Sequence, residues 1–307
     1  MSRLSPMTGD RGRQNLGRQS RGAELWASRR PALSPPVVPN GLDSRLEFRL
    51  IYRVYLLAVV WKGLEMAKEK FIVGTSGAYH DGERTQVHYG PLAAYAVELS
   101  GVTGRRPKIG YLATACGDQM ARIAERHEAA RLRGWDFNPL RLFMMPNVED
   151  VEGYLLDQDV IWVDGGSVVN LLAVWRAHGL DEIMRKAWDA GIVLAGVSAG
   201  SMCWHVGGAT DGFGPKLRRQ TDGLGFLPYG NGVHYGVNPM RRELIKEMVG
   251  DGTFERAYNS ENGIALVYKD TELVEVLSDR DDVYGWHTFR DGDAVVEEQL
   301  QPRRLPA

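Results

Sequence analysis

From residue 70 onward, short apolar runs alternate with amphipathic stretches, and this alternation constrains the fold more than any other feature. The apolar runs have the length and composition of buried strands. They cover residues 71–74, 108–113, 140–143, 160–163 and 192–196. The stretches with helical period cover residues 118–133, 167–178 and 181–190. Strands that alternate with helices predict an α/β fold with a doubly wound, mostly parallel sheet and helices on both of its faces.

Capping and turn residues mark the ends of several of these expected elements. Ser167 precedes the second helical stretch as a candidate N-cap, and Gly179 closes it. The third stretch begins with a further candidate cap, Asp181. Later in the chain, the apolar runs 264–268 and 273–277 are separated by a short polar turn. These two runs predict a C-terminal antiparallel hairpin that completes the sheet.

The first 65 residues differ from the rest of the chain. They are rich in Arg, Ser, Pro and Gly and show no sustained strand or helix period, which is typical of unfolded segments. We therefore expect a disordered or non-native extension over 1–65, with the native start at Met66, and a single α/β domain over 66–307. A basic targeting or interaction tail is the alternative. The apolar run 50–61 could form one helix, but a membrane span needs roughly twenty apolar residues.

Composition limits the functions that are available to the chain. With a formal net charge of −2, it offers no concentrated basic face for nucleic acid, and we expect no membrane partner. The two cysteines, Cys116 and Cys203, have neither the number nor the spacing of a disulfide framework or a zinc site. This usage favours a reducing, cytoplasmic location without a metal. The sequence leaves the oligomeric state open, with a homodimer among the alternatives.

The strongest chemical signal is the sequence Gly-Val-Ser-Ala-Gly at residues 196–200, at the end of an apolar run. It fits the G-x-S-x-G pattern, in which a serine nucleophile sits on a sharp turn from a strand to a helix. Glycines are needed on both sides because a side chain there would collide with the strand or the helix. Ser198 is therefore the candidate nucleophile. The alternative is a glycine-rich turn in which Ser198 only caps the helix.

A second glycine turn, Asp164-Gly165-Gly166-Ser167, also follows an apolar run and precedes a helix. Adjacent glycines let backbone N–H groups approach a ligand oxygen without interference from a Cβ atom. Both turns are expected at the carboxyl edge of the sheet, where the sites of α/β proteins form. Acyl transfer needs two amides that converge on an oxyanion, and this turn could supply one. A tight turn with an N-cap is the alternative.

A serine nucleophile needs a base, and the chain has seven histidines. His234 is the candidate because it ends a short extended segment, flanked by glycines and a proline, and can fold back over the nucleophile. The carboxylate that orients it would be Asp211 or, less favoured, Asp222. We expect His205 on the same helix as Ser198, pointing away from the hydroxyl. The other histidines are interpreted as helix residues (His127 and His178), residues that could line a pocket (His80 and His88) and a structural residue (His287).

The order and spacing of these motifs resemble one family. The run from Val163 to Tyr235, with its Gly165-Gly166 turn and its Leu227-Pro…His234-Tyr block, is similar to the peptidase E (aspartyl dipeptidase) family. Its members are serine peptidases on the class I glutamine amidotransferase-like fold, and cyanophycinases are more distant relatives. The resemblance covers residues 71–277 and none of the N-terminal extension.

The resemblance implies roles for particular residues. Ser198 would be the nucleophile, His234 the base and Asp211 the acid that orients the base. The backbone amides of Gly166 and Ala199 would form the oxyanion hole.

Two departures from the family pattern bear on specificity. The amidotransferase relatives carry cysteine at the position of Ser198, so a glutaminase half-reaction is disfavoured. Aspartyl dipeptidases grip the acidic side chain of the substrate with an arginine downstream of the histidine. Arg241 and Arg242 lie near that position, but the intervening loop is shorter here, and an ordinary helix-surface arginine is the alternative. Glu261 is a further candidate for the substrate pocket.

The sequence therefore predicts a serine-type hydrolase that cleaves small peptides through an acyl-enzyme on Ser198. The resemblance implies a dipeptidase with a preference for an acidic N-terminal residue and with no metal or organic cofactor. An esterase of the α/β-hydrolase type is disfavoured because the His-Gly-Gly turn that it needs upstream is absent. A non-catalytic protein that binds a small molecule on the same fold is the other alternative.

Overall fold

The computed structural model describes residues 69–306, all of which lie in one compact unit. The predictions for residues 1–65 and for the run 50–61 lie outside the described residues. The strands are β1 (Phe71–Thr75), β2 (Tyr79–Asp81), β3 (Val87–Tyr89), β4 (Lys108–Leu112), β5 (Asp136–Leu140), β6 (Val160–Val163), β7 (Val193–Val197), β8 (His205–Thr210), β9 (Arg218–Gln220), β10 (Leu227–Val233), β11 (Arg256–Ser260), β12 (Ile264–Lys269), β13 (Glu272–Ser278), β14 (Gly285–Asp291), β15 (Ala294–Leu300) and β16 (Arg303–Arg304). The helices are α2 (Pro91–Glu98), the 3₁₀ turn η1 (Thr114–Cys116), α3 (Met120–Leu132), α4 (Val151–Leu156), α5 (Val168–His178), α6 (Leu180–Asp189), α7 (Ala199–Met202) and α8 (Pro239–Gly250).

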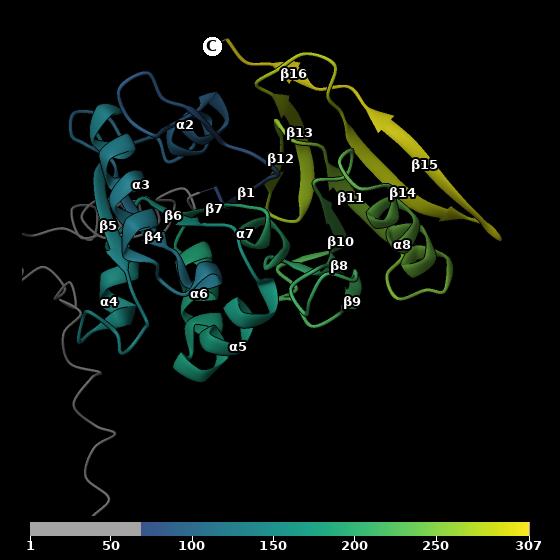
Figure 1. Ribbon diagram of the computed structural model, residues 1–307, viewed down its shortest axis with the longest axis horizontal. Helices are drawn as coiled ribbons and strands as arrows, with labels where there is room; N and C mark the ends of the chain where they lie inside the picture. The colour runs from purple at the N-terminus through teal and green to yellow at the C-terminus, as the bar shows by residue number, and fades with distance from the viewer. Residues whose placement is uncertain (1–68, 307) are drawn as a thin grey trace, which may run out of the picture. The chain divides into compact units, whose positions relative to one another are not determined.

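The main sheet has eight strands in the order β16-β13-β12-β1-β7-β6-β4-β5. Five neighbouring strands of this sheet are mutually parallel, namely β1, β7, β6, β4 and β5. β12 and β13 form an antiparallel hairpin that adds to β1, so the predicted C-terminal hairpin is confirmed. Figure 1 shows the helices α2 and α3 on one side of these strands and α4, α5 and α6 on the other. The predicted α/β fold, with a mostly parallel sheet covered on both faces, is confirmed.

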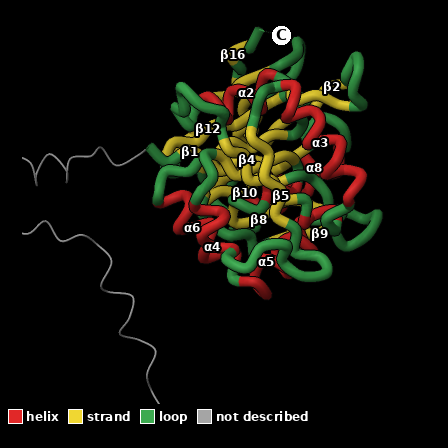
Figure 2. Tube along the Cα trace, turned by 90° about the vertical axis from the view of Figure 1, so that its left-hand side faces the viewer, coloured by secondary structure: helices red, strands yellow, loops and turns green. Residues whose placement is uncertain are grey.

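Successive residues of the buried strands point to opposite faces of the main sheet, as a period of two requires. Ile72 of β1 packs in the core that contains α5 and α6, whereas its neighbour Val73 packs in the core that contains α2 and α3. The strands therefore sit in the middle of the molecule with helices around them (Figure 2). Burying each such aliphatic side chain contributes roughly 1.5–3 kcal/mol to stability.

The helix ends follow the predicted caps in part. The Ser167 hydroxyl accepts a hydrogen bond from the N–H of Asn170 at 3.2 Å and caps α5, as predicted. Gly179 closes α5 in a left-handed conformation (φ 69°, ψ 20°) and is also the N-cap of α6. Asp181 is therefore not the cap. It lies in the first turn of α6, where a negative charge suits the helix dipole.

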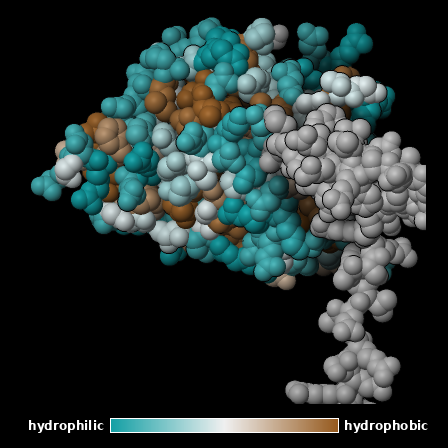
Figure 3. All heavy atoms as spheres, turned by 180° about the vertical axis from the view of Figure 1, so that it is seen from behind, coloured by the Kyte–Doolittle hydropathy of each residue, from teal (hydrophilic) through white to brown (hydrophobic). Residues whose placement is uncertain are grey.

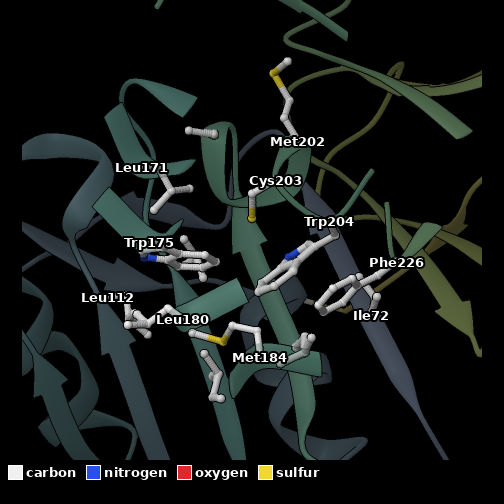
Figure 4. Close-up of a cluster of buried hydrophobic side chains, with 14 of the residues drawn as sticks. Ile72, Leu112, Leu171, Trp175, Leu180, Met184, Met202, Cys203, Trp204 and Phe226 are labelled. Carbon is white, nitrogen blue, oxygen red and sulfur yellow. The ribbon is translucent and has the colours of Figure 1, made fainter. Parts of the chain in front are cut away.

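Two further predicted positions were wrong. The strand predicted at 140–143 is β5, which ends at Leu140. It is the edge strand of the sheet, a position that tolerates Pro139, and the backbone N–H groups after Arg141 turn away to the carboxylate of Asp118. His205 does not continue the helix after Ser198 but begins β8, because α7 ends as the chain enters a cluster of buried aromatic rings that includes Trp204 (Figure 4).

A second, six-stranded sheet was not predicted. Its order is β15-β14-β11-β10-β8-β9, and its central strands β8, β10 and β11 are parallel. α8 packs on this sheet through Ile245, Met248 and Val249. A two-stranded hairpin of β2 and β3 completes the described strands.

The described helices include none that is long and apolar enough to cross a membrane. On the face opposite to that of Figure 1, hydrophilic residues cover most of the visible surface and apolar areas lie between them (Figure 3).

A buried histidine predicts how stability depends on pH. Burial lowers the pKa of His205 to about 4, whereas a histidine in an unfolded chain titrates near 6.5. Between these values the unfolded state binds a proton that the folded state does not, so acidification from pH 6.5 to pH 4 destabilises the fold by roughly 3 kcal/mol at this residue. We expect the variant His205→Gln to lose this part of the pH dependence, measured as the free energy of unfolding in urea at a series of pH values. A variant with the pH dependence of the parent protein would contradict this assignment.

Candidate active site

The predicted site residues follow the carboxyl ends of parallel strands in both sheets. In the main sheet, the turn at Gly165 and Gly166 follows β6, and Ser198 follows β7. In the second sheet, His234 follows β10 and Asp211 follows β8. The two sets of strand ends meet, because the Ser198 hydroxyl lies 2.9 Å from Nε2 of His234. The site is therefore built between the two sheets.

Ser198 has a backbone conformation that few residues adopt. Its φ is 57° and its ψ is −111°, which is strained for a residue with a side chain. Its own N–H donates to the carbonyl of Thr75 at 2.9 Å, and its carbonyl accepts from the N–H groups of Ser201 and Met202 as α7 begins. These bonds hold the turn so that the hydroxyl points away from the sheet edge and toward His234.

The two glycines of the serine motif are needed because the surrounding backbone leaves no room for a Cβ atom at either position. A Cβ atom on Gly196 would lie 2.4 Å from the carbonyl oxygen of Gly200. A Cβ atom on Gly200 would lie 2.2 Å from the carbonyl oxygen of Val163. Real Cβ atoms essentially never approach backbone so closely. The expected collision of side chains at these positions with the strand and the helix is confirmed.

His234 is held in a defined orientation on both sides of its ring. Its Nε2 faces the Ser198 hydroxyl, and its Nδ1 lies 2.6 Å from Oδ1 of Asn262. A neutral imidazole in this arrangement donates its Nδ1–H to Asn262 and accepts the hydroxyl proton at Nε2. Burial lowers the pKa of His234 below 6.5, and the hydrogen bond to Asn262 opposes that shift in part. The ring is therefore neutral near pH 7 and can act as a base.

Ser76 fixes the backbone of His234 from the other sheet. It directly follows β1, and its hydroxyl oxygen accepts the N–H of His234 at 3.0 Å. The same hydroxyl donates to the carbonyl of Ser260 at 2.9 Å and lies 2.6 Å from the Ser260 hydroxyl. Both serines are buried. His234 has a φ of 54°, and these bonds hold that unusual conformation.

Neither predicted orienting aspartate has a hydrogen bond to His234. Oδ2 of Asp211 accepts from Arg241 at 2.8 Å, and Asp222 pairs with Arg176 at 2.8 Å. The charge of Asp211 only opposes, in part, the lowering of the pKa of His234 that burial causes. The position next to Nδ1 is taken by Asn262, which the sequence analysis did not single out.

Asn262 could have been found only from the pairing of strands. It comes two residues after the end of β11, and β11 pairs in parallel with β10, so that Ser260 is opposite Val233. The carboxyl ends of neighbouring parallel strands lie side by side. The sequence alone does not show that these two short segments are neighbours, because they belong to a sheet that was not predicted.

The turn after β6 lies against the serine. A Cβ atom on Gly165 would be 3.3 Å from Cβ of Ser198, and Gly166 has a φ of 145°. In the described part of the chain, no hydrogen-bond acceptor is recorded for the backbone N–H of Gly166 or for that of Ala199. Two amides without acceptors on the turns that flank Ser198 fit the predicted oxyanion hole.

A buried carboxylate anchors this turn. Asp164 is fully buried and accepts hydrogen bonds from the N–H of Gly165 at 2.8 Å, from Arg122 at 2.7 Å and from the hydroxyls of Tyr79 and Tyr111. A buried charge needs such partners to offset its lost hydration. The direction of the glycine turn is therefore fixed from behind, by the core rather than by solvent.

Both candidate arginines have partners within the protein. The side chain of Arg241 is 9% exposed and donates to the carbonyl of Ala209 and to Asp211. Arg242 lies over the Trp286 ring, with its guanidinium carbon 4.0 Å from the ring centroid, and pairs with Glu297.

Glu261 also has internal partners. Its carboxylate accepts from Nε1 of Trp286 at 2.8 Å and from the N–H of Tyr284 at 3.2 Å. These bonds join it to β14 and the segment before it. Its predicted contact with a substrate stays a prediction.

The other histidines lie in separate surroundings. His80 bonds to Asp279 at 2.6 Å and its ring is 5.4 Å from that of His88, and their role in lining a pocket stays a prediction. His287 lies in β14, and its ring stacks on that of Tyr258. His127 and His178 are exposed helix residues.

Within residues 69–306, no group of three or more His, Cys, Asp or Glu side chains is arranged so that it could hold a metal ion. Both cysteines are free. Burial raises the pKa of each thiol above 9, so neither resembles an activated nucleophile.

Comparison with known proteins shows the family of the chain. The model of the family described as peptidase family S51 matches residues 81–276. The chain belongs to peptidase family S51. A relative from Bacillus subtilis (strain 168), named "Uncharacterized peptidase YgaJ", is 32% identical over 200 residues, which are 65% of this chain and 86% of that protein. The resemblance to the peptidase E family is thereby confirmed, and this S51 member is a peptidase that acts on peptides.

A solved structure shares the fold. The crystal structure of a peptidase from an acI-B1 Actinobacterium has a TM-score of 0.53 and 16% sequence identity, and the match covers 77% of this chain and 96% of that one. At this identity the likeness concerns the fold alone.

The turn at Gly165 and Gly166 provides a first test of the predicted oxyanion hole. An alanine at Gly166 would place its Cβ 2.3 Å from the carbonyl oxygen of Ala115, so the turn would have to move. We expect Gly166→Ala to lower peptide turnover by roughly 10²–10³-fold, as the loss of one oxyanion donor does, measured by steady-state kinetics. Gly101→Ala is the matched control, because Gly101 also has a positive φ but an added Cβ meets nothing within 4 Å. Equal activity of the two variants would argue against an oxyanion role for this turn.

The contact between Asn262 and His234 provides a second test. The base must be neutral to accept a proton, so kcat/KM should rise with pH through the pKa of His234, below 6.5. Asn262→Asp would place a carboxylate next to Nδ1 and raise that pKa by about one to three units. We expect the acid limb of the pH–rate profile to move to higher pH by this amount. Asn238→Asp adds the same charge without a bond to the ring and should move the limb less. An unmoved limb in Asn262→Asp would disprove the contact.

Proposed function

We propose that this S51 peptidase cleaves small peptides through an acyl-enzyme on Ser198, with His234 as the base and Asn262 as the residue that orients it. The observation that carries the proposal is the chain of two hydrogen bonds, 2.9 Å from Ser198 to Nε2 of His234 and 2.6 Å from Nδ1 to Asn262. This is the geometry of a serine triad in which an amide takes the place of the acid. The earlier assignment of Asp211 to the third position has no such hydrogen bond to support it.

The proposed reaction has two acyl-transfer steps. His234 takes the proton of Ser198 as Oγ attacks the carbonyl carbon of the scissile bond. The resulting imidazolium gives this proton to the leaving amine as the C–N bond breaks, which leaves an ester on Ser198. Water then attacks the ester and gives a proton to His234, which returns it to Oγ as the acid product leaves.

The oxyanion of both steps would accept hydrogen bonds from the N–H groups of Gly166 and Ala199. Ala199 is the first residue of α7, so its N–H has no intrahelical partner. The N–H of Gly166 belongs to the turn that Asp164 anchors through Gly165. Such preorganised donors stabilise the transition state because they do not have to reorient as charge develops.

Small peptides are the proposed substrates, without a strict requirement for an acidic first residue. An acidic requirement needs a cation that is free to meet the substrate. Arg241 donates hydrogen bonds to Asp211 and to the carbonyl of Ala209. Arg242 forms an ion pair with Glu297, with 3.1 Å between nitrogen and oxygen. Hydrolysis of dipeptides with acidic and with neutral first residues, compared by kcat/KM, tests this part of the proposal. A strong preference for acidic residues would show that one arginine leaves its partner when substrate binds.

Covalent labelling tests the nucleophile directly. A fluorophosphonate probe should add once to the full-length protein, at Ser198, with the adduct located by mass spectrometry of peptides. Ser198→Ala should abolish labelling and lower peptide hydrolysis by at least roughly 10³-fold. Ser100→Ala makes the same change at a residue whose hydroxyl donates to the Val97 carbonyl in its own helix end, and it should behave like the parent protein. An unlabelled parent protein would favour a non-catalytic binding protein.

A further inference from the structure

A groove lies next to the proposed active site, between two loops of the second sheet. It has a volume of about 400 Å³. One wall comes from residues 215–217, in the loop between β8 and β9, and the other comes from α8 and the residue before it. The apolar part of the lining consists of Pro215, Leu217, Met240 and Leu244. Binding sites for small ligands are hollows of this size with mainly apolar walls.

The wall formed by α8 continues directly from the base. The N–H of Val237 donates to the carbonyl of His234 at 3.1 Å and closes a turn, and the ends of such a turn lie within about 7 Å of each other. Asn238 follows this turn, and its side chain caps α8 by accepting from the N–H of Met240 at 3.0 Å. Asn238 and Met240 both line the groove. The groove therefore opens one residue beyond the turn that carries His234.

The opposite wall continues from a loop that also contacts the turn after β6. In this loop, the carbonyl of Gly212 accepts from the hydroxyl of Ser167 at 3.3 Å. The N–H of Gly214 donates to the carbonyl of Asp211 at 2.9 Å. Pro215 follows at once and lines the groove. The two walls are thus extensions of loops that border the proposed site.

An ion pair joins the two walls. Arg241 of α8 donates to Asp211 at 2.8 Å and to the carbonyl of Ala209 at 2.9 Å. The Arg241 side chain is only 9% exposed, so this contact belongs to the framework of the protein. The spacing of the walls is therefore set before a peptide binds, which lowers the entropic cost of binding.

The proposed chemistry decides which part of a peptide lies near this groove. His234 gives its proton to the leaving amine, which requires about 2.6–3.2 Å between Nε2 and that nitrogen. The leaving residue is therefore held against His234 during the step. Its Cα atom is only about 1.5 Å from the same nitrogen. A side chain on this residue can extend past the turn at His234 and into the groove.

We propose that the groove binds the side chain of the leaving residue and favours a large apolar one, such as leucine or phenylalanine. This inference rests on the proposed acyl-enzyme at Ser198. Met240 is 64% exposed, so an apolar side chain placed against it removes apolar surface from water. The charged residues of the lining are Glu243, Glu247 and Lys216. An acidic side chain would meet more like than unlike charge there, and it is disfavoured.

The test begins with peptides and needs no variant. Dipeptides with a common first residue, alanine in one set and aspartate in the other, carry leucine, phenylalanine, alanine or aspartate as the leaving residue. Members of one set form the same acyl-enzyme, so their kcat/KM values differ only through the leaving residue. We expect leucine and phenylalanine to exceed alanine by about tenfold, with aspartate lowest. Equal values within each set, or no hydrolysis by a protein that is labelled at Ser198, would overturn the inference.

A variant then assigns this preference to the groove. Met240 lies in the first turn of α8, where a negative charge suits the helix dipole, so Met240→Asp should fold. We expect the ratio of kcat/KM for the leucine peptide to that for the alanine peptide to fall by about tenfold. Met120→Asp is the matched control, because Met120 begins α3 and is 58% exposed. It should leave the ratio unchanged.

A second variant on the opposite wall separates loss of apolar contact from added charge. Leu217→Ala shortens the lining and leaves the charge of the groove as it is. It should lower the same ratio severalfold. A ratio that stays at the parent value in both variants would show that the leaving residue binds elsewhere.

The outcomes separate this inference from the proposed function. If Met240→Asp lowers fluorophosphonate labelling and the hydrolysis of all peptides equally, it acts on the base and the inference fails. If the parent protein is not labelled at Ser198, the proposed function itself fails.

Discussion

The site depends on one hydrogen bond that crosses from one sheet to the other. Ser198 follows β7 of the main sheet and His234 follows β10 of the second sheet, and their side chains meet at 2.9 Å. Ser76 strengthens this contact between the two sheets, which we call the seam. It follows β1 of the main sheet and forms hydrogen bonds with His234 and with Ser260 of the second sheet. Buried polar contacts of this kind specify one arrangement, since an unpaired partner in the same place would be costly.

Three residues where the two sheets meet have unusual backbone conformations. Ser198, His234 and Gly166 all have positive φ values, and each belongs to the proposed catalytic machinery. Conformations of this kind persist only where the surroundings enforce them. Here the surroundings are close backbone packing around Gly196 and Gly200 and the buried carboxylate of Asp164, which holds the turn at Gly165 and Gly166.

The electrostatics of the seam favour a neutral base. Burial and the charge of Arg241 lower the pKa of His234, while Asn262 and Asp211 oppose that shift. An amide next to Nδ1 orients the ring without adding a negative charge. The amide therefore stabilises the imidazolium that forms in the reaction less than a carboxylate would. The negative charge of Asp211 acts on the ring in the same favourable direction. The sequence could not separate these two roles, because orienting the ring and supplying charge are usually combined in one residue.

The sequence by itself determined the alternation of strands and helices, the hairpin of β12 and β13, and the serine turn, because these depend on local period and on glycines that relieve local crowding. It also indicated His234, which ends an extended segment. Only the tertiary structure decided which groups face that histidine. Asn262, Ser76 and Asp211 follow strands that are distant in sequence. They meet through parallel pairing in the second sheet and through its contact with the main sheet, and no local pattern encodes that pairing.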